Sequence, residues 1–388
     1  MSGKAIFILV LVVLVLGAGG AFYVVFQQKQ TETQASRQLL QAQAIYQDGG
    51  QDKAVAILTD LIEKYPRSKT KAQALFDLAR IYESNAPAQS LGLFERYLQE
   101  HPKGELVLEA HRQCARLALA QNQIDKAQSH YQFLQSLRQE PYHSTGIVGL
   151  AAIAESQGKV EEAREAYYRI IAEVTGQQEI INEAMDRLSK INTDMLFTQR
   201  VNEFTQRYAV ERGDNPLVIG AKFGSTAYMI QAMNNMTERT LLRNGQSITV
   251  PRPGGVRIVV SKSAKSLYLY SNMEGTQGKF IKRYPVGVAQ FGERTPPGIY
   301  VITEKQLDPT WYPPQGGRIP PGVPENALGS RWMGFSRDGK STSLGIHGTN
   351  APETIGSASS AGCIRMHNED VEELFMIARQ GTEVEIVE

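Results

Sequence analysis

The feature that most restricts the fold of this chain is a helical pattern that recurs through residues 34–195. Within each segment, apolar residues recur every three or four positions, and Ala, Gln, Leu and Glu are abundant, as expected for amphipathic helices. Similar segments begin at Ala54, Ala88, Ala127 and Ala163, with a longer period of about 34 to 39 residues. Such a period predicts an array of paired helices, in which small alanines let neighbouring helices approach closely.

Two of these segments, "GGQDKAVAILTDLIEKYP" and "GKVEEAREAYYRIIAEV", resemble tetratricopeptide repeats. The resemblance implies a helical domain at residues 34–198 that binds partner proteins on a concave face or serves as a spacer. Cys114 falls in one of the helices, where we expect a small buried core residue. The only other cysteine, Cys363, lies in a segment of different character, so we expect no disulfide between them.

Residues 5–26 form the longest uncharged apolar run of the chain, AIFILVLVVLVLGAGGAFYVVF. As a helix this run would be about 33 Å long, which is enough to cross a bilayer. We therefore predict a transmembrane anchor, with a signal peptide cleaved after residues 19–21 as the alternative. Lys4 precedes the run, which favours a cytoplasmic N-terminus in an inner membrane and a periplasmic or other extracytoplasmic location for the rest of the chain.

A third pattern, at residues 206–252, predicts a strand, two short helices and a second strand. Asn215 is placed to cap the first helix, with Pro216 at its first position, and Thr226 to cap the second over residues 227–234. On "YAVERGDNPLVIGAKFGSTAYMIQAMN" and "LLRNGQSITVP", this β-α-α-β unit resembles a LysM module. The resemblance implies binding to the N-acetylated sugars of peptidoglycan. Asn215 stands where that family usually has Thr, so a module with weakened sugar affinity is the alternative.

The remaining residues, 256–388, alternate in the manner of strands and predict a mostly-β domain with one helix. The predicted strands are 257–260, 266–270, 279–288, 298–305, 343–347 and 384–387, and the predicted helix is 370–379. HExxH, paired CxxC, GxxxxGK[ST] and GxGxxG are absent from the sequence, so we expect no metal or cofactor. The charges balance, with 41 Lys and Arg against 40 Asp and Glu, and no basic stripe predicts nucleic-acid binding.

The residues that could carry chemistry are His347, in LGIHGTN, and Cys363, in SSAGCIRM. A thiol is mostly protonated at neutral pH, and a nearby imidazole can accept its proton to leave a nucleophilic thiolate. Acyl transfer also needs backbone N–H groups that hold an oxyanion, and Gly362 has no side chain to cover such amides. The spacing alone leaves open a second reading, with the cysteine in a core and the histidine bonded at a strand end.

The full stretch "SLGIHGTNAPETIGSASSAGCIRMHNEDVEELF" closely resembles the YkuD-type L,D-transpeptidase domain, as do the upstream segments "TPPG" and "ALGSRWMGFS". This resemblance covers residues 256–388 and implies a cysteine enzyme that acts on the tetrapeptide stems of peptidoglycan. D-alanine leaves, a thioester forms on the cysteine, and an amine on a second stem resolves it.

By this resemblance, Cys363 is the nucleophile, His347 is the general base, and the main-chain carbonyl of Gly348 fixes the imidazole tautomer. The amides of Gly362 and Cys363 are the implied oxyanion donors. The residues implied on the substrate side are Arg365, Thr349, Ser360 and Asn350. Arg365 either orients a substrate carboxylate or braces the turn, and the hydroxyls of Thr349 and Ser360 shape loops rather than react.

Three questions stay open at this point. We assign Trp311 and Trp332 to the core, with the wall of a substrate groove as the alternative. Many members of the family carry a second histidine where this chain has Ala361, and the effect of that difference on rate is undecided. The predicted multidomain protein is an L,D-transpeptidase, and the alternatives are an L,D-carboxypeptidase, with water as acceptor, and a non-catalytic scaffold that binds the cell wall.

Overall fold

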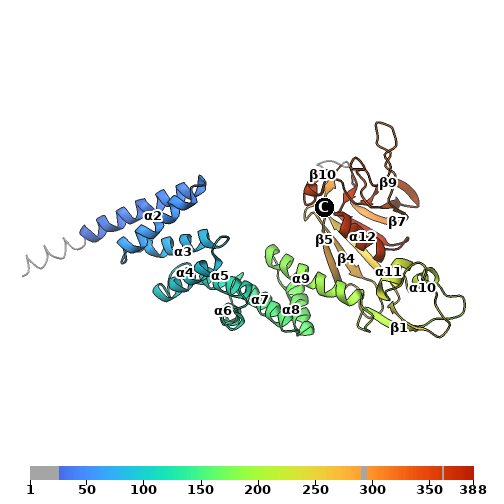
Figure 1. Cartoon of the computed structure of the whole chain (residues 1–388), viewed down its shortest axis with the longest axis horizontal. Coiled ribbons are helices and arrows are strands. Elements are labelled where there is room, and N and C mark those ends of the chain that lie inside the picture. The colour runs from blue at the N-terminus through green and yellow to red at the C-terminus, as the bar shows by residue number, and fades with distance from the viewer. Residues whose placement is uncertain (1–25, 290–294, 361) are drawn as a thin grey trace, which may run out of the picture. The chain divides into compact units, whose positions relative to one another are not determined.

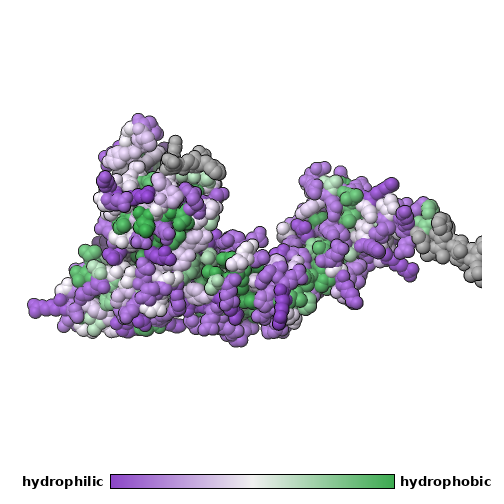
Figure 2. Space-filling model, turned by 180° about the vertical axis from the view of Figure 1, so that it is seen from behind, coloured by the Kyte–Doolittle hydropathy of each residue, from purple (hydrophilic) through white to green (hydrophobic). Residues whose placement is uncertain are grey.

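The computed structural model describes residues 26–289, 295–360 and 362–388. The chain divides into two compact units, residues 1–180 and 181–388, and each is described by itself (Figure 1). Hydrophilic residues cover most of the face shown in Figure 2, with hydrophobic residues exposed in patches between them.

Of the predicted anchor at residues 5–26, only Phe26 is described, so the anchor stays a prediction. Among the described residues, no helix is both long and apolar enough to span a bilayer.

The first unit is a series of helices, each packed against the next along the chain (Figure 1). Residues 26–47 are helical. The helices that follow in this unit are α2 (Gln51–Lys64), α3 (Thr70–Tyr82), α4 (Pro87–Glu100), α5 (Val107–Ala120), α6 (Ile124–Ser136), α7 (Tyr142–Ser156) and α8 (Val160–Glu173). This arrangement confirms the helical repeats that the sequence period predicts.

The sequence predicts four alanines, each near the start of a helix, that let neighbouring helices pack closely. The prediction is confirmed for three of them. Ala54, Ala127 and Ala163 are fully buried at the fourth residue of α2, α6 and α8. The prediction for Ala88 was wrong, because its side chain is exposed. The fourth residue of α4 is the fully buried Ser90, whose Oγ donates a hydrogen bond of 2.7 Å to a carbonyl of α3. A small polar residue therefore takes the alanine's place without leaving a buried hydroxyl unpaired.

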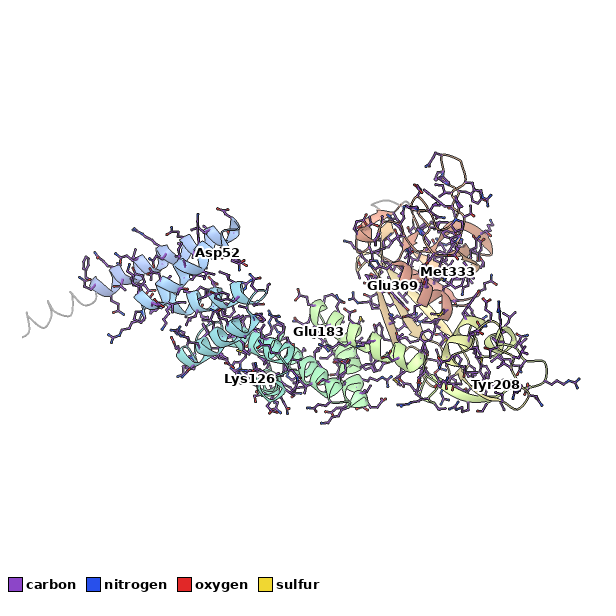
Figure 3. All side chains as sticks on the ribbon, in the orientation of Figure 1. Asp52, Lys126, Glu183, Tyr208, Met333 and Glu369 are labelled. Atoms are coloured by element: carbon purple, nitrogen blue, oxygen red, sulfur yellow. The ribbon has the colours of Figure 1, made fainter. Side chains whose placement is uncertain are left out.

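In the second unit, residues 205–251 form the predicted β-α-α-β arrangement. Its elements are β1 (Thr205–Ala209), α10 (Pro216–Lys222), α11 (Ala227–Met233) and β2 (Ser247–Pro251), and the two strands pair antiparallel. Figure 3 labels Tyr208 on β1. Both predicted helix caps are confirmed. Asn215 Oδ1 accepts from the N–H groups of Leu217 and Val218 at 2.9 and 3.0 Å, and Thr226 Oγ1 accepts from Met229 N–H at 3.0 Å.

The last domain is built on an eight-stranded sheet of order β11-β9-β8-β7-β12-β3-β4-β5. Its strands are β3 (Val256–Ser261), β4 (Ser266–Ser271), β5 (Phe280–Pro285), β7 (Gly298–Leu307), β8 (Arg331–Arg337), β9 (Lys340–His347), β11 (Ile364–Arg365) and β12 (Glu383–Val387). Two short strands, β6 (Val288–Ala289) and β10 (Ala358–Ser360), pair in parallel apart from it, and η1 (Pro352–Thr354) is a 3-10 turn. Helix α12 (Asn368–Ile377) packs on β8 and β9. The predicted helix and the other predicted strands are confirmed, with ends shifted by a few residues. The single strand predicted at 279–288 was wrong, because this segment divides into β5 and β6, which belong to different sheets.

The core beneath this sheet includes side chains from outside residues 256–388. Leu196 of α9 (Gln178–Leu196), the helix on which Figure 3 labels Glu183, belongs to one buried cluster with Met229 and Met233 of α11 and with side chains of the sheet and α12. Helix α9 also covers the edge strand β5, where buried Asn192 Nδ2 donates to the carbonyls of Phe280 and Ile281 at 3.0 and 3.3 Å. The eight-stranded sheet therefore uses α9 and the small module as part of its own core.

We expect a fragment of residues 256–388 to melt at least about 10 °C below a fragment of residues 181–388, or to aggregate. Removing α9 and the small module uncovers the apolar face that Leu196, Met229 and Met233 bury, and it leaves the β5 edge open to pairing with other chains. Circular dichroism melts and gel filtration of the two fragments measure this. Equal melting temperatures and a monomeric short fragment would contradict the shared core.

Candidate active site

Cys363 and His347 are brought together by two neighbouring strands. Strand β9 ends at His347, and β11 begins directly after Cys363. The two strands run parallel, with Ile364 opposite Ile346 and Arg365 opposite His347. Directly opposed side chains share one face of a sheet, and so do residues two apart on a strand. The register therefore places His347 and Arg365 on the same face, and Cys363 directly precedes the strand that carries Arg365.

These side chains line one cavity of about 640 Å³. The loop between β7 and β8 also lines this cavity. The residues that line this cavity include Cys363, His347, Arg365, Ser360, Trp311 and Trp332. Cys363 is half-buried and, as predicted, it is not in a disulfide, since both cysteines are free. Its thiol can therefore meet a ligand that enters the cavity.

The imidazole of His347 is held in one tautomer. Its Nδ1 lies 2.7 Å from the main-chain carbonyl oxygen of Gly348. A carbonyl can only accept, so Nδ1 carries the proton and Nε2 keeps a free lone pair. Burial lowers the pKa of His347 to about 4, with Arg365 acting in the same direction and the bond to Gly348 opposing it. The side chain is therefore neutral at pH 7 and able to accept a proton.

The sulfur of Cys363 is placed by the backbone of β9. The thiol donates to the Ser343 carbonyl oxygen at 3.6 Å, and the Gly345 backbone bonds to the same sulfur. Burial raises the pKa of Cys363, whereas the Gly345 bond and the charge of Arg365 act in the opposite direction. At pH 7 the cavity is thus lined by a neutral thiol and a neutral imidazole. A thiolate, once formed, would be stabilised by Gly345 and Arg365.

The turn before Cys363 is fixed by two hydroxyl groups. Gly362 has φ 146°, in the region that favours glycine. Its N–H donates to Ser360 Oγ at 3.3 Å, and the same hydroxyl donates to the Cys363 carbonyl at 2.7 Å. Thr295 Oγ1 donates to the Gly362 carbonyl at 2.5 Å. Ser360 therefore shapes the turn. Ala361, where the family often has histidine, lies outside the described residues.

Two regions of this chain are similar to known protein families. Residues 255–386 match the L,D-transpeptidase catalytic domain YkuD, and residues 1–190 match a tetratricopeptide repeat-like domain. A Bacillus subtilis protein named as the L,D-transpeptidase YkuD is 38% identical over 185 residues, 46% of this chain and 97% of that protein. Its Bacillus licheniformis counterpart is 35% identical over 184 residues, with the same coverage. This chain belongs to the YkuD family of L,D-transpeptidases.

Two other proteins named as L,D-transpeptidases match over a smaller share of their own length. The Escherichia coli protein named as the L,D-transpeptidase ErfK/SrfK is 32% identical over 183 residues, 41% of this chain and 56% of that protein. Among solved structures, an L,D-transpeptidase from Mycobacterium smegmatis is 13% identical, covering 37% of this chain and 64% of its own, with a TM-score of 0.27.

The four predicted substrate-side residues of this YkuD domain divide between two cavities. Ser360 and Arg365 line the cavity of Cys363, and Arg365 also donates to Thr354 Oγ1 at 3.4 Å, so both roles considered for this arginine stay open. Thr349 and Asn350 instead line a second cavity of about 490 Å³. The structure therefore does not bring Thr349 and Asn350 to the candidate nucleophile.

Asn368, the first residue of α12, holds the loop after His347 and was missed by the sequence reasoning. Its Oδ1 accepts from the N–H groups of Ser330 and Thr349 at 3.3 and 3.1 Å, and its Nδ2 donates to the Thr349 carbonyl at 3.0 Å. A Cβ on Gly348 would collide with this Oδ1, which explains the glycine there. The available signal was an asparagine directly after the IRMH segment, two residues before the predicted helix 370–379.

Trp311 and Trp332 form part of the cavity wall, and their assignment to the core was wrong. Both are half-buried and line the cavity of Cys363. The Trp332 ring lies against His347, with centroids 5.9 Å apart and planes tilted by 32°. Its indole N–H donates to Glu304 Oε2 at 3.3 Å. This face of the sheet borders the cavity. The two indole rings therefore line the cavity and are not packed within the core.

Gly345→Ala is expected to disturb this wall. A Cβ there would lie 2.6 Å from the Met333 carbonyl oxygen and 2.8 Å from Trp332 Cη2, so either the strands or the indole must shift. We expect a loss of about 1–3 kcal/mol of stability, as for other overpacked sites. We also expect iodoacetamide to alkylate Cys363 several-fold more slowly. Thermal melting and the alkylation rate measure the two effects.

The matched control is Gly287→Ala, at another glycine close to the site. A Cβ there would meet its nearest neighbours at 3.4 Å, which is ordinary contact. We expect this variant to melt and to react like the wild type. If Gly345→Ala also behaves like the wild type, the close packing between β8 and β9 has no bearing on the thiol.

Proposed function

We propose that this chain is a peptidoglycan L,D-transpeptidase in which Cys363 is the nucleophile and His347 the general base. The observation that carries the proposal is the tautomer of the His347 imidazole. Its Nδ1–H is bound to the Gly348 carbonyl at 2.7 Å, which leaves Nε2 as an acceptor in the cavity that the free Cys363 thiol also lines. Membership of the YkuD family supports the same reaction class.

In the proposed first step, Cys363 Sγ attacks the carbonyl carbon of the bond between the third stem residue and the terminal D-alanine. The thiol proton passes to His347 Nε2, and the oxygen becomes an oxyanion held by backbone N–H groups. The C–N bond then breaks, and the imidazolium returns the proton to the leaving amine of D-alanine. The product is a thioester on Cys363.

In the second step, an amine of another stem attacks the thioester carbonyl. His347 Nε2 accepts the proton of the attacking amine, the C–S bond breaks, and the departing thiolate of Cys363 recovers a proton from the imidazolium. The stem is thereby joined to the acceptor through a new amide bond. Arg365, with its charge beside the sulfur, would stabilise the thiolate both before attack and on departure.

The other parts of the chain suit an enzyme of the cell wall. The small module has its own core of Val210, Ile219, Ile230, Ile248 and Val250, and we propose that it binds glycan as LysM modules do. The alignment with the Bacillus proteins is longer than the match at residues 255–386, which supports a shared segment beyond the catalytic domain. We further propose an inner-membrane anchor at residues 5–26, a periplasmic enzyme, and protein partners on the repeats.

The test is turnover of purified tetrapeptide muropeptides by the fragment of residues 27–388. We expect release of D-alanine together with cross-linked dimers, separated by chromatography and identified by mass. Release of D-alanine with trimmed tripeptides alone would replace the proposal by an L,D-carboxypeptidase. No release at all, with intact protein, would favour a wall-binding scaffold.

A further inference from the structure

Thr295 has no role in the reaction as described, yet it bonds directly to the turn before the nucleophile. It is 1% exposed and lies just before β7, and its Oγ1 donates to the Gly362 carbonyl at 2.5 Å. The backbone carbonyls of Thr295 and of the next residue, Pro296, are both hydrogen-bonded. Lys262 Nζ donates to the Thr295 carbonyl at 3.4 Å, and Tyr300 OH donates to the Pro296 carbonyl at 2.8 Å. The hydroxyl is therefore held in place by its surroundings.

This hydrogen bond fixes the direction of the Cys363 N–H. The carbonyl of Gly362 and the N–H of Cys363 belong to the same peptide group, which is planar and trans, so the two point in opposite directions. Fixing the carbonyl at Thr295 Oγ1 thus aims the N–H away from Thr295. A hydrogen bond to the carbonyl also polarises the peptide group and strengthens its N–H as a donor.

The other amide of the turn is already engaged. The Gly362 N–H donates to Ser360 Oγ at 3.3 Å, and that hydroxyl in turn donates to the Cys363 carbonyl. Of the two amides implied as oxyanion donors, only that of Cys363 is left to meet a new acceptor without breaking a described bond. The orientation of that single N–H therefore matters more than it would in a site with two free donors.

We propose that Thr295 is a positioning residue for oxyanion stabilisation, because its hydroxyl aims and polarises the Cys363 N–H. The proposal rests on the proposed function, since it assumes acyl transfer to Cys363. Thr295 does not touch the substrate. Its effect should appear only in steps that pass through a tetrahedral oxyanion, and not in the general reactivity of the thiol.

Two reactions of the same thiol separate these effects. Acylation by a carbapenem passes through a tetrahedral oxyanion, whereas alkylation by iodoacetamide displaces iodide at a saturated carbon and forms none. Thr295→Val keeps the shape of the side chain and removes the hydroxyl. We expect it to slow acylation by about 10- to 100-fold, with alkylation within about twofold of the wild type. Thr295→Ser keeps the hydroxyl and should restore acylation to within a few-fold.

Three results would overturn the proposal. These are acylation of Thr295→Val at the wild-type rate, a parallel fall of acylation and alkylation in Thr295→Val, and a loss in Thr295→Ser as large as that in Thr295→Val. The second result would show that Thr295 only maintains the turn. Thr295→Ala serves as the replacement if the valine variant does not fold, as judged by its melting curve. Failure of the proposed function looks different, because the wild type itself would be alkylated but not acylated.

Discussion

A Cys363→Ala variant is expected to release no D-alanine and to form no cross-linked dimers from tetrapeptide muropeptides. Without the sulfur no thioester can form, and loss of a nucleophile of this kind reduces turnover by about 10⁴-fold or more. The half-buried methyl group should leave the fold unchanged. Chromatography of the muropeptide products, with a melting curve for each protein, measures the effect.

The matched control is the chain's other cysteine. Cys114 is fully buried on α5, and burial raises the pKa of its thiol to about 12, so it has no access to substrate and almost no thiolate at neutral pH. Cys114→Ala should therefore turn over muropeptides at the wild-type rate. Substantial turnover by Cys363→Ala, or its loss in Cys114→Ala with an intact fold, would assign the chemistry to another residue.

His347→Gln is expected to lower kcat/KM for the same substrate by about 10²- to 10⁴-fold, the usual range for loss of a general base. Glutamine can still donate to the Gly348 carbonyl but cannot accept the thiol proton. The effect should lie mainly in kcat, because the imidazole acts on the thiol and not on the bound stem. His367→Gln, at a histidine outside the cavity, is the control and should be unaffected.

The pH dependence of kcat/KM tests the state of this base. Burial lowers the pKa of His347 to about 4, so the side chain is neutral above that pH and protonated below it. Since only the neutral imidazole accepts a proton, activity should be flat from about pH 5 to 8 and fall as the pH drops through about 4. A fall centred near pH 6.5, the ordinary histidine value, would contradict the buried and neutral His347.

The elements with strong local signals were predictable from the sequence. The helical period, the caps at Asn215 and Thr226, and most strands of the sheet follow from side-chain pattern and capping chemistry, which act within a few residues. The error at Ala88 has a similar cause. The period located the helix correctly, but the sequence did not show that serine could take the buried place of alanine by bonding to the preceding helix.

The residues that hold the site in place could not be predicted from the sequence, because their roles depend on contacts between distant segments. Thr295 meets Gly362 across the fold, and Asn368 braces Gly348 from a different element. Neither side chain has a local pattern that reveals its partner. The same holds for Trp332, whose position beside His347 depends on the register of β8 with β9. Such contacts become visible only when strand order and register are known.

Intact-mass spectrometry of the fragment of residues 27–388 after incubation with a carbapenem tests the central claim most directly. We expect a single adduct of the mass of the carbapenem, mapped by digestion to the peptide that contains Cys363. The adduct should be present in Cys114→Ala and absent from Cys363→Ala. A wild-type protein that stays unmodified, or an adduct that persists in Cys363→Ala, would contradict Cys363 as the nucleophile.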